Sequence, residues 1–132
     1  MEVLYQHYLI TDDKKGIFPK SVKKLLDTSY WAPNRSLDVI EKTIQNSICV
    51  GVFDEEELIA FARVVTDKAV FAWIADVIVD TAHRGKGIGK EMIRFIQNHP
   101  DIPAHSQLLR TRDAHGLYEK YGFTKNDNIM SK

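Results

Sequence analysis

The sequence predicts one α/β or α+β domain, in which a mixed β-sheet is flanked by helices. Three observations carry this prediction. Extended apolar stretches and amphipathic stretches of helical period follow one another along the chain. The central third holds three extended stretches separated only by short polar turns, which indicates an antiparallel meander. The last third alternates helical and extended stretches, which is typical of helices packed against a sheet.

The composition is that of a single globular domain: 132 residues, of which 44% are hydrophobic and 27% charged. We expect residues 1–132 to form one domain, because no repeat, low-complexity segment or linker interrupts them. Lys and Arg total 18, as do Asp and Glu, so the net charge is zero and a nucleic-acid partner is not expected. No apolar run reaches the ~18 residues of a membrane span, and Cys49 is the only cysteine. We therefore expect a cytoplasmic protein without a membrane partner.

The first part of the chain predicts one strand and two helices. Residues 3–10 are apolar and aromatic, which favours a strand. Residues 19–29 carry apolar side chains at helical spacing, and Pro19 suits the first turn of that helix. Ser36 is a favourable N-cap for a second helix over residues 37–44.

The meander follows, and the helical period returns after it. Strands are predicted over residues 47–53, 58–65 and 70–79. The third of these is almost wholly apolar. An amphipathic helix is then predicted over residues 87–98, and a short strand over residues 108–111.

The end of the chain predicts one more helix and one more strand. Asp113 is the expected N-cap of this helix. Gly122 lies where a left-handed glycine commonly ends a helix. From Phe123 onward a final strand is expected.

The most informative segment is a glycine-rich turn between a buried strand and a helix. It consists of Arg84, Gly85, Lys86, Gly87, Ile88, Gly89 and Lys90. Glycines let the backbone approach a ligand closely, and the first amides of a helix carry partial positive charge. Because three cationic side chains add full charges, the turn predicts a cradle for a phosphate or pyrophosphate group. The alternative is a flexible loop with solvated basic side chains.

Two common nucleotide motifs do not fit this turn. A P-loop requires Gly-Lys-Ser/Thr, whereas Gly89-Lys90 is followed by Glu91, and position 84 holds arginine instead of glycine. The dinucleotide fingerprint requires Gly-x-Gly-x-x-Gly in the first βα unit of a parallel sheet. Here the spacing is Gly-x-Gly-x-Gly, and the motif comes after an antiparallel meander.

Two motifs together resemble those of the GNAT N-acetyltransferase superfamily. Residues 84–89 match Arg/Gln-x-x-Gly-x-Gly/Ala, between a strand and an amphipathic helix as in that family. Residues 113–123 (DAHGLYEKYGF) are similar to its second signature, Ala-x-x-Leu/Phe-Tyr-x-Lys-x-Gly-Phe. The resemblance covers nearly the whole chain. It implies a mixed, mostly antiparallel sheet of six to seven strands with about four helices, split at the strand over residues 70–79.

The resemblance implies acetyl-CoA as co-substrate. Its pyrophosphate would bind the amides of the glycine-rich turn, and its pantetheine arm would run beside the preceding strand. The strand residues concerned are Val77, Ile78 and Val79. No metal is expected, because no histidine pair shows metal-ligand spacing. His83 and His115 flank the two motifs and are expected to be surface or loop residues.

The chemistry that the resemblance implies is direct transfer of the acetyl group to a primary amine. Tyr118 matches the tyrosine that protonates the leaving thiolate in many relatives; the alternative is a packed aromatic. Asp76 is the only ionisable residue in its apolar strand and is the candidate general base. The alternatives are a structural ion pair of Asp76 with Arg63, or a water chain without a dedicated base.

The acceptor pocket is expected near the connection between the first two helices. Tyr30, Trp31 and Arg35 lie in this connection, and Arg35 or Arg63 could hold a substrate carboxylate. Packing and solvated charge are the alternatives for these residues. We expect a small-molecule amine as acceptor. The resemblance also implies a possible homodimer, because members of the family often form dimers. The alternative function is a non-catalytic acyl-CoA-binding sensor or scaffold module.

Overall fold

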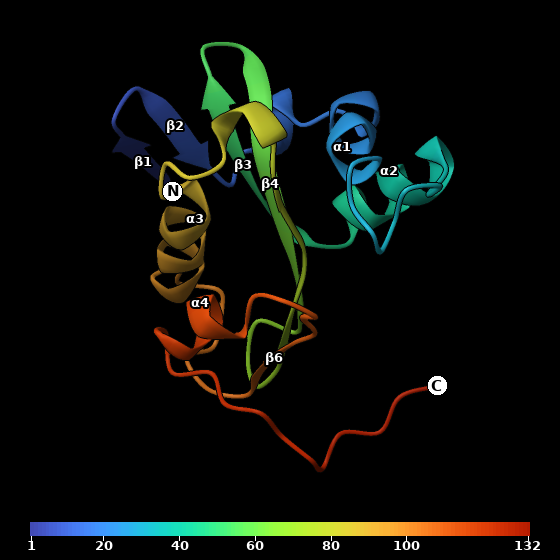
Figure 1. The fold of residues 1–132 in the computed structure, drawn as a ribbon, viewed down its shortest axis with the longest axis vertical. Helices are drawn as coiled ribbons and strands as arrows, with labels where there is room; N and C mark the ends of the chain where they lie inside the picture. Colours follow the sequence, from blue (N-terminus) through green and yellow to red (C-terminus); the bar gives the residue numbers. More distant parts are fainter.

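A six-stranded β-sheet forms the centre of the molecule, and its strands lie side by side in chain order (Figure 1). The computed structural model describes residues 1–132. Each of the first four strands is antiparallel to the next, whereas β5 and β6 are parallel, which confirms the mixed, mostly antiparallel sheet. The strands are β1 (Glu2–Tyr5), β2 (Tyr8–Thr11), β3 (Ile48–Asp54), β4 (Glu57–Thr66), β5 (Ala72–Val79) and β6 (Gln107–Leu109).

Helices cover both faces of this sheet (Figure 1). They are α1 (Pro19–Leu26), α2 (Leu37–Gln45), α3 (Ile88–Gln97) and α4 (His115–Glu119), with the short 3-10 turns η1 (Lys14–Gly16) and η2 (Thr81–His83). Under α1 and α2 the core contains Val22, Leu26, Ile40, Phe61 and Ile78. On the other face, apolar side chains of α3 pack on β3, β4 and β5, and Tyr118 of α4 joins them. This burial drives the packing of the helices on the sheet.

The sheet opens beside β5. Strand β6 pairs with β5 only from Ala72 to Ile74. From Ala75 to Val79, β5 therefore has a neighbour on the β4 side alone. An unpaired stretch of strand presents main-chain donors and acceptors that can bind an extended ligand. The structure thus has the expected split at this strand.

A β-bulge lies in the same stretch. Phe61 of β4 is opposite Ile78 and Arg63 is opposite Ala75, so two residues of β5 face one residue of β4. One of the two is Asp76, whose φ of 55° lies in the left-handed region. A bulge of this kind re-aims the side chains around it. Here it directs Asp76 towards the α1–α2 face of the sheet, where it meets Arg35 and Trp31.

Two predictions for the N-terminal part are wrong in detail. Residues 3–10 form a hairpin of two strands and not one strand, because Gln6 takes a left-handed conformation (φ 56°) and Tyr5 pairs with Tyr8. Helix α1 ends at Leu26, three residues before the predicted end. The hydroxyls of Thr28 and Ser29 bond to carbonyls of its last turn, which stops the helix there. The predicted N-cap of α2 is confirmed, since Ser36 accepts from the amide of Val39.

Strand β5 begins two residues later than predicted. The carboxylate of Asp67 accepts hydrogen bonds from the amides of Ala69, Val70 and Phe71, which holds these residues in a turn. The helix over residues 87–98 is confirmed as α3, apart from one residue at each end.

The C-terminal predictions are confirmed only in part. Gly122 has the predicted left-handed conformation (φ 88°). Asp113 is not the N-cap of α4, because the helix begins one residue later, at His115, and no side chain caps it. The amide of Ala114 bonds instead to the Thr111 hydroxyl. No strand forms after Phe123, and the last residues run away from the body (Figure 1).

No helix is long and apolar enough to cross a bilayer.

Candidate functional site

The glycine-rich turn leaves the first turn of α3 without a cap. Gly87 is the N-cap residue, with φ 80°, and no side chain bonds to the first amides of the helix. These amides therefore have no acceptor within the protein, and they carry partial positive charge. Arg84, Lys86 and Lys90 are exposed and form no ion pair in the structure. The arrangement can bind a multiply charged anion.

Tyr5 supports this turn from the first strand. Its hydroxyl donates a 2.7 Å hydrogen bond to the carbonyl of Lys86. A Cβ atom on Gly87 would lie 2.8 Å from that hydroxyl, so the turn and the tyrosine fit only with glycine at this position. At Gly89, by contrast, no atom lies within 4 Å of the place that a Cβ would occupy. Sequence analysis did not single out Tyr5, since 81 residues separate the two partners.

The strand residues assigned to the pantetheine arm lie beside this turn. The side chains of Ile78 and Ile88 are buried in the two cores, with exposed fractions of 4% and 2%, so only their main chains face a ligand. The carbonyl of Val79 accepts a 3.1 Å bond from Arg84 Nε and is already used within the protein. Val77 is half-buried and lies in the unpaired stretch of β5.

Tyr118 is buried on α4 but makes no hydrogen bond through its hydroxyl. Burial, together with the smaller effects of Tyr30 and Asp113, raises the pKa of Tyr118 to about 12. At neutral pH the side chain is therefore a neutral O–H donor. The side chain borders a cavity, so the hydroxyl is not sealed into the core.

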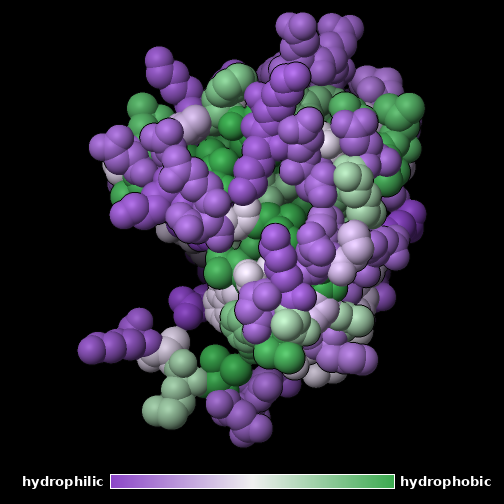
Figure 2. All heavy atoms as spheres, turned by 180° about the vertical axis from the view of Figure 1, so that it is seen from behind, coloured by the Kyte–Doolittle hydropathy of each residue, from purple (hydrophilic) through white to green (hydrophobic).

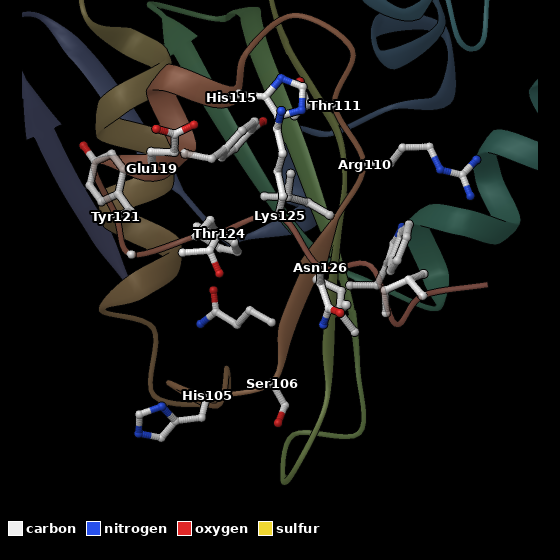
Figure 3. A pocket seen from close by; sticks show the side chains of 18 of the residues that line it. His105, Ser106, Arg110, Thr111, His115, Glu119, Tyr121, Thr124, Lys125 and Asn126 are labelled. Carbon is white, nitrogen blue, oxygen red and sulfur yellow. The ribbon is translucent and has the colours of Figure 1, made fainter. Parts of the chain in front are cut away.

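This cavity has a volume of about 610 Å³ and lies between β6, α4 and the C-terminal segment (Figure 3). Its size is in the range of small-ligand sites, which is about 300–1,000 Å³. Its lining includes Trp73, Arg110, His115, Tyr118 and Tyr121. Tyr121 also donates a 3.1 Å bond to the carbonyl of Lys90, which ties the end of α4 to the first turn of α3.

Four predicted site residues meet at one carboxylate. Oδ1 of Asp76 accepts from Trp31 Nε1 at 3.0 Å, and Oδ2 accepts from Arg35 Nη1 at 2.7 Å and from Arg63 Nε at 2.5 Å. We call these residues the Asp76 cluster. It joins the α1–α2 connection to β4 and to the bulge of β5. The predicted ion pair between Asp76 and Arg63 is present.

This environment makes Asp76 a poor general base. Burial alone would raise the pKa of its carboxyl, but the hydrogen bonds and charges of Arg35 and Arg63 outweigh burial and hold the pKa below its ordinary value. Both oxygens already accept from strong donors. The geometry thus favours the ion-pair alternative over the catalytic one.

Tyr30 extends the cluster to the segment that connects β6 with α4. The guanidinium of Arg112 lies 3.7 Å above the Tyr30 ring, and the Arg112 amide donates a 3.3 Å bond to the Tyr30 hydroxyl. Tyr30 also packs edge-on against Trp31, with 5.1 Å between ring centroids. These contacts join the α1–α2 connection to the segment between β6 and α4, across the part of the sheet where β5 and β6 separate. The sequence analysis did not identify Arg112.

The structure holds no cluster of His, Cys, Asp and Glu side chains suited to a metal ion. Nδ1 of His83 lies 3.1 Å from Oδ2 of Asp80, so this histidine has a carboxylate partner within the chain. His115, expected to be a surface or loop residue, is half-buried at the first position of α4 and lines the cavity together with Tyr118.

Comparison with known proteins agrees with this geometry. The family model of the acetyltransferase (GNAT) domain matches residues 45–125. The chain is 33% identical to a GNAT-family protein of known structure from Xanthomonas campestris, with a TM-score of 0.91 over 98% of this chain and 94% of that one. It is 31% identical to an uncharacterized ycf52-like N-acetyltransferase of Prochlorococcus marinus, over 57% of this chain and 44% of that protein.

A more distant structure shares the fold. It is glucosamine-6-phosphate N-acetyltransferase from Arabidopsis thaliana, 19% identical, with a TM-score of 0.67 over 95% of this chain and 97% of that one. The family model covers more than half of the chain and includes the glycine-rich turn, the Asp76 bulge and Tyr118. The chain therefore belongs to the GNAT acetyltransferase family.

Proposed function

We propose that this protein transfers an acetyl group from acetyl-CoA directly to the primary amine of a small molecule. The observation that carries the proposal is the uncapped start of α3, with three unpaired cations, next to the unpaired stretch of β5. The turn suits the pyrophosphate, and the strand suits the amides of the pantetheine arm. The family membership supports acetyl transfer.

The reaction would need the amine in its neutral form, because an ammonium group has no free electron pair. The amine nitrogen attacks the thioester carbonyl, a C–N bond forms, and the C–S bond then breaks. The proton of the amine passes to water, since Asp76 is committed to its ion pairs. Holding amine and thioester together supplies much of the acceleration.

Tyr118 would assist the leaving group as a hydrogen-bond donor. The ordinary pKa of a thiol, about 8.5, lies well below the pKa of about 12 of this tyrosine. Full transfer of its proton to the thiolate is therefore unfavourable. A hydrogen bond to the sulfur stabilises the developing negative charge without that cost.

Replacement of Tyr118 by Phe tests this role. We expect kcat to fall about a hundredfold, which is typical for loss of one positioned donor. Affinity for acetyl-CoA in calorimetric titration should stay within a few-fold of the parent. Thiol release and calorimetry are to be measured on the same preparation. Unchanged turnover and pH profile would refute the role of Tyr118, and cofactor binding without turnover of any amine by the parent would favour the sensor alternative.

Tyr5→Phe removes one support of the glycine-rich turn. We expect affinity for acetyl-CoA to fall about fivefold, because one hydrogen bond is worth about 1 kcal/mol. Affinity for acetylpantetheine, which lacks the pyrophosphate, should not change. Leu4→Ala, at an exposed neighbour in β1, is the control. Equal losses for both ligands would mean that Tyr5 acts on the fold as a whole and not on this turn.

A further inference from the structure

The Asp76 cluster has more positive than negative charge. One carboxylate faces two guanidinium groups, and neither Arg35 nor Arg63 has another acidic partner. The side chains are largely shielded from water, with exposed fractions of 4% for Asp76, 21% for Arg35 and 16% for Arg63. One positive charge is therefore left over in a partly desolvated place, where an unbalanced charge is costly.

The two arginines also have unused hydrogen-bond donors. Arg35 bonds to Asp76 through Nη1 only. Arg63 uses Nε for Asp76 and Nη1 for the hydroxyl of Ser47, at 3.3 Å. A guanidinium carries five N–H groups on its three nitrogens. Nε and Nη2 of Arg35 and Nη2 of Arg63 thus have no acceptor within the protein.

The cluster lies next to the strand that we propose for the pantetheine arm, which is where an acceptor amine would have to approach the thioester. Asp76 lies in the bulge of β5, directly before Val77 in the strand that would hold the pantetheine arm. Trp31 within the cluster and Tyr30 beside it have exposed fractions of 40% and 48% and can be reached from solvent. Arg112, above Tyr30, adds a further guanidinium without an acidic partner. Seen from behind, the outline of the molecule is hollowed between the part that carries α1 and α2 and the C-terminal segment (Figure 2).

We propose that the acceptor amine carries an oxyanion, a carboxylate or a phosphate, which binds Arg35 and Arg63. This inference rests on the proposed acetyl transfer and specifies its substrate class. Asp76 is a positioning residue in this view: it holds both guanidinium groups in place and leaves one net positive charge for the substrate. A planar guanidinium binds a carboxylate or phosphate with two parallel hydrogen bonds. The same charge disfavours polyamines.

Matched amines test the proposal by thiol release from acetyl-CoA. The carboxylate arm compares 4-aminobutyrate with 4-aminobutanamide and butylamine, and the twenty amino acids with their amides. The phosphate arm compares phosphoethanolamine with ethanolamine. We expect kcat/KM to be at least tenfold higher for the anionic member of each reactive pair. The arm that reacts identifies the oxyanion.

A binding measurement makes the result independent of turnover. The same anionic amines are titrated calorimetrically into the parent protein saturated with CoA. We expect Arg35→Ala to weaken this binding at least tenfold and to abolish the preference over neutral amines. The control Arg94→Ala removes a guanidinium from an exposed surface ion pair with Glu91. It should change neither the affinity for anionic amines nor the preference for them over neutral amines. Urea unfolding of both variants checks that they are folded.

The outcomes separate the two proposals. Preference for neutral or cationic amines, or failure of every anionic amine to bind the CoA complex, overturns the anionic acceptor while acetyl-CoA binding stands. A preference that survives in Arg35→Ala also overturns it. Absence of acetyl-CoA binding to the parent refutes the proposed function itself.

Discussion

Gly89→Glu is expected to abolish detectable binding of acetyl-CoA while the protein stays folded. Gly89 lies in the first turn of α3, and the position of its missing Cβ has no neighbour within 4 Å. A glutamate side chain therefore meets no protein atom there, but it places a negative charge where the pyrophosphate would bind. Two like charges about 4 Å apart near a surface repel by about 4 kcal/mol, a loss of several hundredfold or more in affinity. Calorimetric titration measures the loss.

Gly89→Ala is the matched control, because it adds the Cβ without the charge. It should retain binding, and unfolding in urea should show it slightly more stable, by about 0.5–1 kcal/mol, as for glycine to alanine within a helix. Gly87 is less suitable, since its left-handed backbone and its contact with Tyr5 would make any substitution strained. If Gly89→Glu binds acetyl-CoA as tightly as the parent, the pyrophosphate does not lie on this turn.

Local patterns predicted the parts of the fold that local physics determines. The apolar stripe of α3 was sufficient to place that helix within a residue at each end, because Met92, Ile93 and Ile96 all face the core. Ser36 and Gly122 act through bonds and backbone angles within a few residues of themselves. Their effects can be read from a short window of sequence.

The element boundaries were predicted wrongly where a turn or a side-chain hydrogen bond takes the place of regular strand structure. The left-handed Gln6 turns one apolar run into a hairpin, and nothing in its neighbours requires that conformation. The carboxylate of Asp67 accepts hydrogen bonds from the amides of Val70 and Phe71, which the apolar run had assigned to a strand. The stretch after Phe123 has no partner strand, so its pattern alone does not produce a strand.

The site was predictable by residue type but not by arrangement. Arg63 was an expected partner of Asp76 because the two lie on neighbouring strands of a meander. Trp31 and Arg35 reach the same carboxylate from 45 and 41 residues away, through a bulge that one sequence does not reveal. The role of Asp76 therefore changed from base to charge partner once the donors around it were known.

Asp76→Ala is expected to destabilise the protein strongly. Removal of the carboxylate leaves Arg35 and Arg63 facing each other with little water around them and deprives Trp31 of its acceptor. Breaking a buried ion pair from one side typically costs about 3–5 kcal/mol of unfolding free energy. Urea unfolding of parent and variant at pH 7 measures the difference. A difference below about 1 kcal/mol would mean that water solvates both arginines well, and the argument for an unbalanced charge at this site would fail with it.

The difference in unfolding free energy between the parent and Asp76→Ala should decrease at acid pH. The pKa of Asp76 is lower in the folded protein than its ordinary value of 3.8, so the unfolded chain binds a proton to it more readily. Its contribution to stability is therefore fully present above that ordinary value, and it is lost as the pH falls through the lower, folded-state pKa. Other carboxyls titrate in the same range, so the quantity to follow is the gap between parent and Asp76→Ala. A gap that stays constant from pH 7 to 5 and narrows below pH 4 identifies the ionised Asp76 carboxylate as its source, whereas a gap that does not narrow in acid assigns the loss to packing instead of charge.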